Sequence, residues 1–373
     1  MIDRFRPAFL PLCLALFLVA AIPPPPLPAA DFGPLPERSG ISSAPMVSVP
    51  FDLSRYRLNW KKRIEAMRRE GILPVIDIES SFDPSAIDAK RFAEQMDRNG
   101  FALVAFSPEV GAKAFRKDGR VWSDAARRAL SVDPWRYIPV TTAGIDPAWT
   151  EKPEAFLEET IKRAQAEGYP LLGEFEFRHY PSPRQLKRNE FHRDVSIPID
   201  GPLGHRLFAC AEQTGIPFEI HYEIEERLLP PLEEMLKRYP KAKVIWCHLA
   251  QIRYSSRSGV YGPEYVGRLI EAHPNLYFDV AFGDSTSTYP GSGEFHARIW
   301  QDSSGNVKKE WSELIAKYPW RFLSALDLGG DRMDSLPAGS KTLRAFLEKL
   351  PPPAREIVAY KAAWKLLFNE ELP

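Results

Sequence analysis

Eight short apolar segments recur along the chain at intervals of a few tens of residues, and helix-like stretches separate them. These stretches carry apolar residues at three- and four-residue spacing and end at Gly or Pro, as Pro84–Asn99 does before Gly100. Continuous apolar strands that alternate with helices indicate a parallel sheet covered on both sides. Eight such units fit a closed barrel better than an open sheet, so we predict an α/β fold with one (β/α)8 TIM barrel domain. The predicted strands are Leu73–Ile78, Phe101–Phe106, Tyr137–Thr141, Leu171–Phe177, Pro217–His221, Lys243–Cys247, Leu276–Ala281 and Arg321–Leu326.

The first fifty residues have a different character from the rest of the chain. Residues 1–30 combine an early positive charge at Arg4 and Arg6 with an apolar run over residues 8–22 and small residues nearby, which is typical of a secretory signal. The run is shorter than the ~20 residues of a spanning helix, so we expect export to the periplasm or the medium, with a membrane anchor at residues 8–22 as the alternative. Residues 31–50 are rich in Pro, Gly and Ser and predict a linker, which leaves 51–373 for the barrel.

The charge of the chain disfavours nucleic acid as a partner. Its 373 residues include 49 basic and 49 acidic side chains, and basic clusters such as Lys61-Lys62-Arg63 are interleaved with acidic and apolar residues. Phosphate binding usually requires a lopsided positive surface. We therefore expect a small-molecule substrate, and membrane contact only through the N-terminal segment, while the oligomeric state is undetermined. Cys210 and Cys247 are too few for a disulfide scaffold and are predicted to be core thiols.

Potential metal ligands or proton carriers stand where predicted strands end. His221 ends the fifth strand, His248 follows the sixth and Asp327 follows the eighth. The carboxyl ends of all barrel strands converge on one mouth, so these three residues are expected in one site. Because alternate side chains of a strand face the lumen, Glu174 and Glu176 of the fourth strand should share one face.

The same alternation places further carboxylates in the lumen. It groups Asp77, Glu79 and Ser81 at the first strand, and Glu219 with His221 at the fifth. Burying bare carboxylates is costly unless a cation, a histidinium or a proton compensates them, and a metal ion would do so. His, Asp and Glu are ligands of zinc and of manganese. A divalent ion acidifies water near neutral pH, and an aspartate or histidine could move the proton. The alternative is a hydrogen-bonded His–Glu network in the core.

The spacing of His221, His248 and Asp327 resembles the amidohydrolase superfamily, and in particular its amidohydrolase-related branch of metal-dependent decarboxylases and lactone hydrolases. The segment 354–368 also resembles the helix that closes that branch, so the likeness spans residues 73–368. The resemblance implies that His221 is a metal ligand, His248 a second ligand or the proton-transferring histidine, and Asp327 a ligand or general base. Glu174 matches the position of a bridging lysine or glutamate, with Glu176 beside it.

The first strand departs from the family pattern. That pattern is Asp-x-His-x-His, whereas this chain has Asp77-Ile78-Glu79-Ser80-Ser81. Glu79 can ligate a metal and Ser81 is a poor ligand. Three outcomes are open: weaker zinc binding, a harder metal on Glu79, Glu174 and Asp327, or no metal. Zinc is the first expectation, and manganese and iron are the alternatives.

Arginines in the predicted mouth loops could clamp a substrate carboxylate in a bidentate pair. We expect Arg253 foremost, then Arg178 with Glu176, to bind substrate; loop salt bridges are the alternative. Gly283-Asp284-Ser285 resembles the nucleophile strand of Gly-Asp-Ser esterases, but no histidine follows His296 to serve as its base. We expect that segment to be a loop shaping the pocket.

These expectations predict an exported, metal-dependent hydrolase that acts on a small ester, lactone or amide through metal-activated water, with His248 and Asp327 as catalytic residues. Decarboxylation in the same site is a close variant. The competing hypothesis is a metal-free degenerate barrel that serves as a binding or scaffold protein of the cell envelope.

Overall fold

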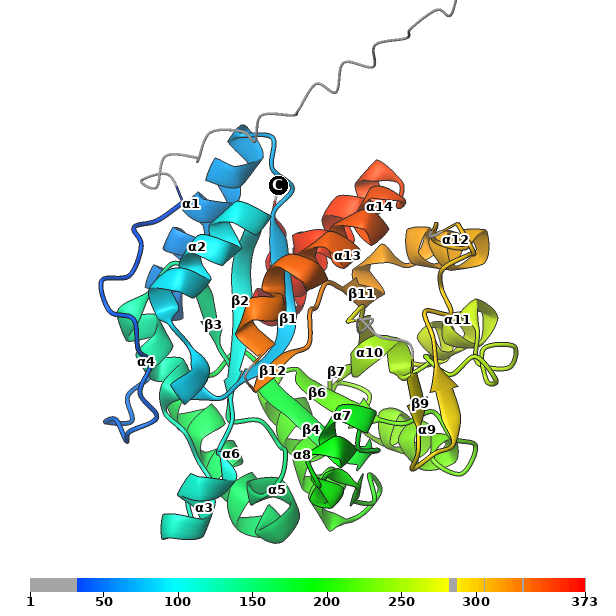
Figure 1. Ribbon diagram of the computed structural model, residues 1–373, viewed down its shortest axis with the longest axis horizontal. Helices are drawn as coiled ribbons and strands as arrows, with labels where there is room; N and C mark the ends of the chain where they lie inside the picture. The colour runs from blue at the N-terminus through cyan, green and yellow to red at the C-terminus, as the bar shows by residue number, and fades with distance from the viewer. Residues whose placement is uncertain (1–31, 282–286, 305, 331, 373) are drawn as a thin grey trace, which may run out of the picture.

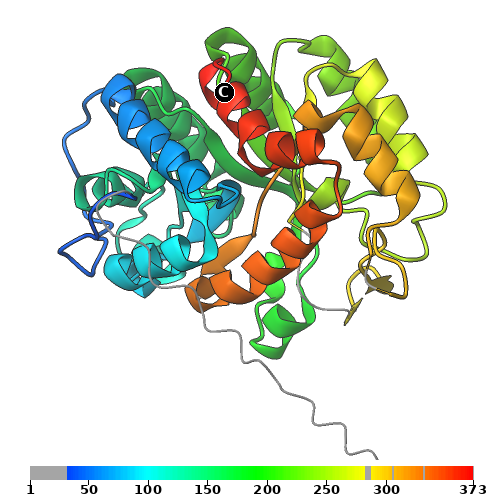
Figure 2. The same ribbon diagram turned by 90° about the horizontal axis from the view of Figure 1, so that it is seen from above.

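The computed structural model describes residues 32–281, 287–304, 306–330 and 332–372, which form a barrel of parallel strands surrounded by helices (Figures 1 and 2). One run of hydrogen-bonded strands has the order β12-β1-β2-β3 and the other has the order β11-β8-β7-β6-β4-β5. The strands are β1 (Val75–Phe82), β2 (Phe101–Pro108), β3 (Tyr137–Pro139), β4 (Leu172–His179), β5 (Val195–Ser196), β6 (Phe218–Tyr222), β7 (Val244–Trp246), β8 (Leu276–Asp279), β9 (Ser287–Tyr289), β10 (Glu294–His296), β11 (Phe322–Leu323) and β12 (Leu328–Gly330).

The two runs of strands join into a closed barrel. A parallel bridge pairs Val140 with Leu171 and so connects the β3 segment to β4. On the other side, the Ile78 N–H of β1 donates to the Ser324 carbonyl, which follows β11, at 3.0 Å. The predicted (β/α)8 barrel is therefore confirmed, and each of the eight predicted strands overlaps an observed barrel strand.

Helices cover the outside of the barrel on all sides (Figure 2). The α-helices are α1 (Leu53–Arg69), α2 (Ala89–Asn99), α3 (Ala112–Asp118), α4 (Ala125–Val132), α5 (Ala148–Glu151), α6 (Pro153–Glu167), α7 (Pro183–Lys187), α8 (Pro202–Thr214), α9 (Leu229–Arg238), α10 (Cys247–Ala250), α11 (Pro263–Ala272), α12 (Lys309–Lys317), α13 (Leu336–Glu348), α14 (Pro352–Glu356) and α15 (Ala362–Phe368). Short 3-10 turns are η1 (Pro84–Ala86), η2 (Phe191–Arg193), η3 (Pro319–Arg321) and η4 (Arg332–Ser335), and a π-helical turn, η5 (Ile357–Lys361), links α14 to α15.

The helix boundaries follow from local sequence. Gly100 ends α2 and Gly168 ends α6, each with a left-handed backbone, at φ of 70° and 73°, that glycine adopts without a Cβ clash. Asp88 caps the start of α2 by accepting a hydrogen bond from the Arg91 N–H. Such stops return the chain to the barrel, and the next strand begins within a few residues.

Additional short elements stand at the carboxyl ends of the strands, where the mouth lies. The chain from Tyr180 to Ile199 leaves β4, forms α7 and η2, and returns as β5, which pairs antiparallel with the end of β4. A β9–β10 hairpin follows β8, and α7 contacts β9. We call the stretch from residue 180 to residue 199 the β4 excursion. The β4 excursion and the hairpin both contribute residues to the wall of the mouth.

The segment 32–50 lies against the barrel in extended form. Phe32 and Ile41 are buried, and the guanidinium of Arg136 donates to the Gly33 carbonyl at 3.0 Å. The Ser48 hydroxyl donates to Glu167 Oε1 at 2.7 Å. The division into a linker and a barrel from residue 51 remains a prediction.

The predicted signal or anchor at residues 1–30, including the apolar run 8–22, lies outside the described residues, as does the Gly283-Asp284-Ser285 motif. Within residues 32–372, as far as they are described, no helix is both long enough and apolar enough to cross a membrane.

Candidate active site

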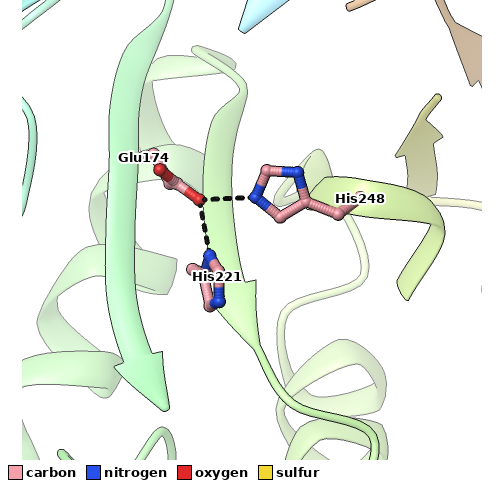
Figure 3. Close-up of side chains that lie close together, drawn as sticks. All are labelled: Glu174, His221 and His248. Atoms are coloured by element: carbon pink, nitrogen blue, oxygen red, sulfur yellow. Dashed lines mark hydrogen bonds and ion pairs between the residues drawn. The ribbon is translucent and has the colours of Figure 1, made fainter. Parts of the chain in front are cut away.

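A carboxylate between two imidazoles forms the floor of the mouth (Figure 3). Glu174 comes from β4, His221 from β6 and His248 from the turn after β7. Glu174 Oε1 lies 3.0 Å from His221 Nδ1 and 3.4 Å from His248 Nε2. All three residues are buried, and one ligand atom from each lies within 4.8 Å of the others. The structure thus brings together three residues that the sequence predicted as metal ligands.

The charges of this cluster are coupled. Burial alone would raise the pKa of Glu174, but hydrogen bonds from His221 and His248 hold it well below its usual range. Burial alone would lower the pKa of His221, but Glu174 and Glu223 raise it to about 9. Without a metal ion, the protein therefore holds Glu174 and His221 as an ion pair at neutral pH. His221 Nε2 lies 3.6 Å from Glu223 Oε1, which exceeds hydrogen-bonding distance, and finds no other partner among the described residues.

The two predicted catalytic residues, His248 and Asp327, both have a left-handed backbone conformation. Residues 248–251 all have φ between 52° and 57°, and Asp327 has φ of 50°. Such conformations cost roughly 1–2 kcal/mol for each residue that has a Cβ. Hydrogen bonds hold them in place, because the His248 N–H donates to Asp279 Oδ1 at 3.0 Å and the Asp327 N–H donates to the Glu79 carbonyl at 3.1 Å. Backbone strain concentrated in this way is typical of functional sites.

A second cluster shares His248 with the first. Glu79 of β1, His248 and Asp279 of β8 each offer a ligand atom within 4.8 Å of the others. In the part of the chain that the structure describes, both Glu79 oxygens and Asp279 Oδ2 lack a hydrogen-bond partner. Burial, then the charges of Asp327 and Glu174, raises the pKa of Glu79 well above its usual value, and burial raises that of Asp279. The lumen is therefore rich in carboxylates that a cation would stabilise.

Asp279 was not among the predicted site residues. Its sequence signal is its place at the end of an apolar strand, the same signal that singled out His221. Glu219, which the alternation placed on the His221 face, is also buried, and burial raises its pKa well above its usual value.

Asp327 lies in the cavity wall but belongs to neither cluster. Its side chain forms an ion pair with Arg332 at 3.0 Å and is 31 % exposed. Glu176 also lines the cavity and pairs with Arg193 of the β4 excursion. Burial raises the pKa of Glu176 to about 7, although Arg193 opposes the shift.

The two arginines predicted to bind substrate have different positions. Arg253 lines the cavity; one of its terminal nitrogens lies 3.2 Å from Glu223 Oε1, and its buried Nε has no partner among the described residues. Burial alone would raise the pKa of Glu223, but Arg253 and then His221 lower it to about 2. Arg178 lies outside the cavity wall, because its guanidinium is bound to Asp194 at 2.6 Å and to the Val195 carbonyl at 2.7 Å. Arg178 thus fastens the β4 excursion in this structure, and its role in substrate binding remains a prediction.

The cavity above these residues has a volume of about 830 Å³. Of the seven histidines in the chain, all of them described, five line it: His179, His192, His221, His248 and His296. His179 and His296 had no assigned role in the sequence, and neither did Arg193, which reaches the cavity from the β4 excursion. His179 Nδ1 donates to the Arg193 carbonyl at 2.6 Å, which fixes the tautomer that leaves Nε2 as an acceptor.

These donors fit a divalent metal ion. Imidazole nitrogens and carboxylate oxygens are the ligands of zinc and manganese sites, and the two clusters present them buried and close together. The unpartnered oxygens of Glu79 and Asp279 are those expected where a cation belongs. The fold and the site therefore define a (β/α)8 barrel with a candidate metal centre at the carboxyl ends of its strands.

Comparison with known proteins specifies the family. The model of the amidohydrolase family matches residues 79–303, which is more than half of the chain, so the protein belongs to the amidohydrolase family. A comparison with curated protein sequences gives no match.

Solved structures of similar fold include several enzymes. Dihydroxybenzoic acid decarboxylase from Polaromonas sp. JS666, with bound manganese and 2-nitroresorcinol, is 11% identical with a TM-score of 0.51, over 80% of this chain and 98% of that chain. 2,6-Dihydroxybenzoate decarboxylase complexed with 2,6-dihydroxybenzoate is 11% identical with a TM-score of 0.50, over 79% and 99%. 4-Oxalomesaconate hydratase from Rhodopseudomonas palustris is 14% identical with a TM-score of 0.46, over 88% and 94%. At these identities the likeness to the two decarboxylases establishes the fold alone.

Proposed function

We propose that the protein is a divalent-metal-dependent enzyme of the amidohydrolase family that hydrolyses a small ester, lactone or amide. The observation that carries this proposal is the buried contact of Glu174 with both His221 and His248 at the floor of the cavity. A barrel that only binds or scaffolds has no need for buried carboxylates whose oxygens lack partners, because each costs folding free energy. The metal-free binding barrel is therefore the less favoured reading.

Glu174, His221 and His248 would hold the ion, and Glu79 could contribute from β1. A bound divalent ion polarises a substrate carbonyl and lowers the pKa of a neighbouring water. Zinc and manganese both suit this mixture of nitrogen and oxygen donors.

The side chains around the floor would orient the substrate and move protons. Asp327 is placed in the cavity wall with one carboxylate oxygen on Arg332, and its carboxylate can accept a proton from the reacting group. Arg193 and Arg253 both line the cavity, and each has a buried Nε–H without a partner among the described residues. These two N–H groups would donate to substrate oxygens and so orient the bond that breaks.

Decarboxylation is the second candidate reaction. The cavity wall contains the guanidinium groups of Arg193, Arg253 and Arg332, which suit a substrate that carries a carboxylate. Two of the solved structures of similar fold are decarboxylases of dihydroxybenzoates, and this supports including aromatic carboxylates among the substrates to be tested.

We propose in addition that residues 1–30 direct export, on the composition of that segment. Fractionation of cells expressing the full chain, with N-terminal sequencing of the product, tests this. A shortened chain in the periplasm or the medium would support cleavage. An intact chain in the membrane fraction would indicate the anchor at residues 8–22, and an intact chain in the cytoplasm would contradict export.

The enzymatic proposal is tested by elemental analysis of protein purified without chelator or an affinity-metal column, followed by a screen of esters, lactones, amides and aromatic carboxylates. His221→Ala should lose both metal and turnover. His205→Ala is the matched control, because His205 lies outside the cavity and contacts the hydroxyl of Tyr239. If the wild-type protein folds but holds no metal after exposure to zinc, manganese and iron salts, the metal-dependent proposal fails.

A further inference from the structure

We infer that the face of α7 that lines the cavity is an outer subsite for an anionic group, so that the substrate carries a negative charge at the end remote from the reacting carbonyl. Arg184 and Lys187 are the specificity-determining residues of this subsite. The inference rests on the proposed metal-dependent function and specifies its class of substrate.

The first argument is the orientation of α7. The helix begins with a capping box, in which the Ser182 N–H donates to Gln185 Oε1 at 2.7 Å and the Gln185 N–H donates to the Ser182 hydroxyl at 3.3 Å. Residues three and four positions apart lie on one face of a helix, so Arg184, Lys187 and Arg188 share a face. All three line the cavity. The sequence of α7 therefore concentrates positive charge on its cavity side.

The second argument is that two of these three charges are not neutralised. Arg188 forms an ion pair with Glu190 at 2.8 Å. No carboxylate of the described residues lies within ion-pairing distance of Arg184 or Lys187, and both side chains are exposed at the outer part of the cavity. Two uncompensated cations on one wall attract an anionic group and disfavour a cationic one.

The third argument is the continuation of this wall into the cavity. Arg193, further along the same β4 excursion, also lines the cavity, and its buried Nε–H has no acceptor among the described residues. One segment of chain thus presents positively charged hydrogen-bond donors from its exposed helix to its buried turn. Anionic oxygens are the acceptors that such donors bind most strongly.

The size of the cavity indicates an elongated substrate. Its volume of about 830 Å³ lies towards the upper end of the roughly 300–1,000 Å³ found for small-molecule sites. The cavity extends from the buried floor at Glu174 and His221 to the exposed side chains of α7. A substrate whose carbonyl lies at the floor and whose far end reaches α7 carries its anionic group there.

The test measures the binding of product-like acids that differ only at the far end. Glutarate, adipate and suberate are compared with pentanoate, hexanoate and octanoate by calorimetric titration of the purified protein at low ionic strength, where surface charges are least screened. Each pair has one chain length, and the ratio of the two affinities reports recognition of the second carboxylate. The phosphonate analogue of each dicarboxylate shows whether a carboxylate or a phosphate-like group is preferred, and either preference supports the subsite.

The variant Arg184→Ala/Lys187→Ala removes both uncompensated cations. At the chain length that binds best, the ratio of affinities should fall by at least about threefold, because each exposed ion pair contributes modestly. Arg55→Ala/Lys62→Ala is the matched control, since it removes the same two charges from exposed positions of α1 outside the cavity, and it should keep the wild-type ratio. If circular dichroism shows that the α7 double variant does not fold, Lys187→Glu takes its place and should lower the ratio in the same way.

Equal ratios in wild type and the folded α7 variant would overturn the inference, and so would a wild-type protein that binds no dicarboxylate more tightly than its monocarboxylate. Metal-dependent turnover found in the same protein would then leave the proposed function in place. Conversely, a lowered ratio in the α7 variant alone supports the anionic subsite. If that protein holds no metal and turns over no substrate, the proposed function fails while the subsite is retained.

Discussion

Replacing His221 with Gln should remove a pH dependence of stability that the metal-free protein shows between pH 6.5 and pH 9. Glu174 and Glu223 raise the pKa of His221 from 6.5 to about 9, against the effect of burial. The folded protein therefore keeps a proton on His221 through this window, whereas the unfolded chain has lost it. The stabilisation is complete below pH 6.5 and disappears as the pH rises through 9.

The expected size follows from the shift. Each pKa unit corresponds to about 1.4 kcal/mol, so the full shift corresponds to roughly 3 kcal/mol of folding free energy. His221 is 4 % exposed, so solvent screens the interaction little. Because the protons of the cluster are shared between coupled groups, we expect a decrease of about 1–3 kcal/mol across the window.

The assay is urea unfolding followed by tryptophan fluorescence, at several pH values between 6.5 and 9, in the presence of a chelator. Wild type and His221→Gln are compared at each pH, so that titrations common to both proteins, such as those of Glu79 and Asp279, largely cancel. The stability advantage of wild type should decrease as the pH rises. If the two unfolding free energies run parallel from pH 6.5 to pH 9, the ion pair between His221 and Glu174 does not exist in the folded protein, and our reasoning is wrong.

Two further predictions concern stability away from the metal ligands. Arg193→Ala should destabilise the protein by about 3 kcal/mol in urea unfolding, because it leaves Glu176 buried without its partner. The control is Arg184→Ala, at an exposed position of α7, which should change the free energy of unfolding by less than about 0.5 kcal/mol. Equal losses of stability in the two variants would refute the argument. Gly204→Ala should cost about 1–3 kcal/mol or more, because a Cβ there would lie 1.7 Å from the Ile199 carbonyl oxygen. Gly259→Ala, where a Cβ meets nothing within 4 Å, is its control, and a Gly204→Ala protein as stable as this control would contradict the prediction.

The barrel could be predicted from the sequence because its signals are local. Apolar strands such as Phe101–Phe106 and helix stops such as Gly100 and Gly168 depend on residues a few positions away. Strand alternation also placed Glu174 in the lumen, and the convergence of strand ends brought it to His221 and His248. These inferences need only the period of a strand and the common direction of the strands.

Other parts of the site could not be predicted in this way. Arg193 reaches the cavity through the β4 excursion, whose course depends on β5 pairing with β4 and on the bonds that Arg178 makes to Asp194 and Val195. His296 reaches the cavity on the β9–β10 hairpin, whose two strands pair with each other and which forms a bridge to Tyr254. No periodic pattern specifies where such a loop returns, because its contacts come from distant parts of the chain.

The sequence by itself determined the barrel, the strand ends that carry ligands and the face on which Glu174 lies, because backbone periodicity and side-chain alternation are properties of neighbouring residues. Only the tertiary structure decided the surroundings of two aspartates near the strand ends. Asp327 pairs with Arg332 in the cavity wall. The N–H groups of His248 and Ala281 hold Asp279 beside Glu79, and because His248 and Glu79 come from other strand ends, no local sequence pattern specifies these contacts.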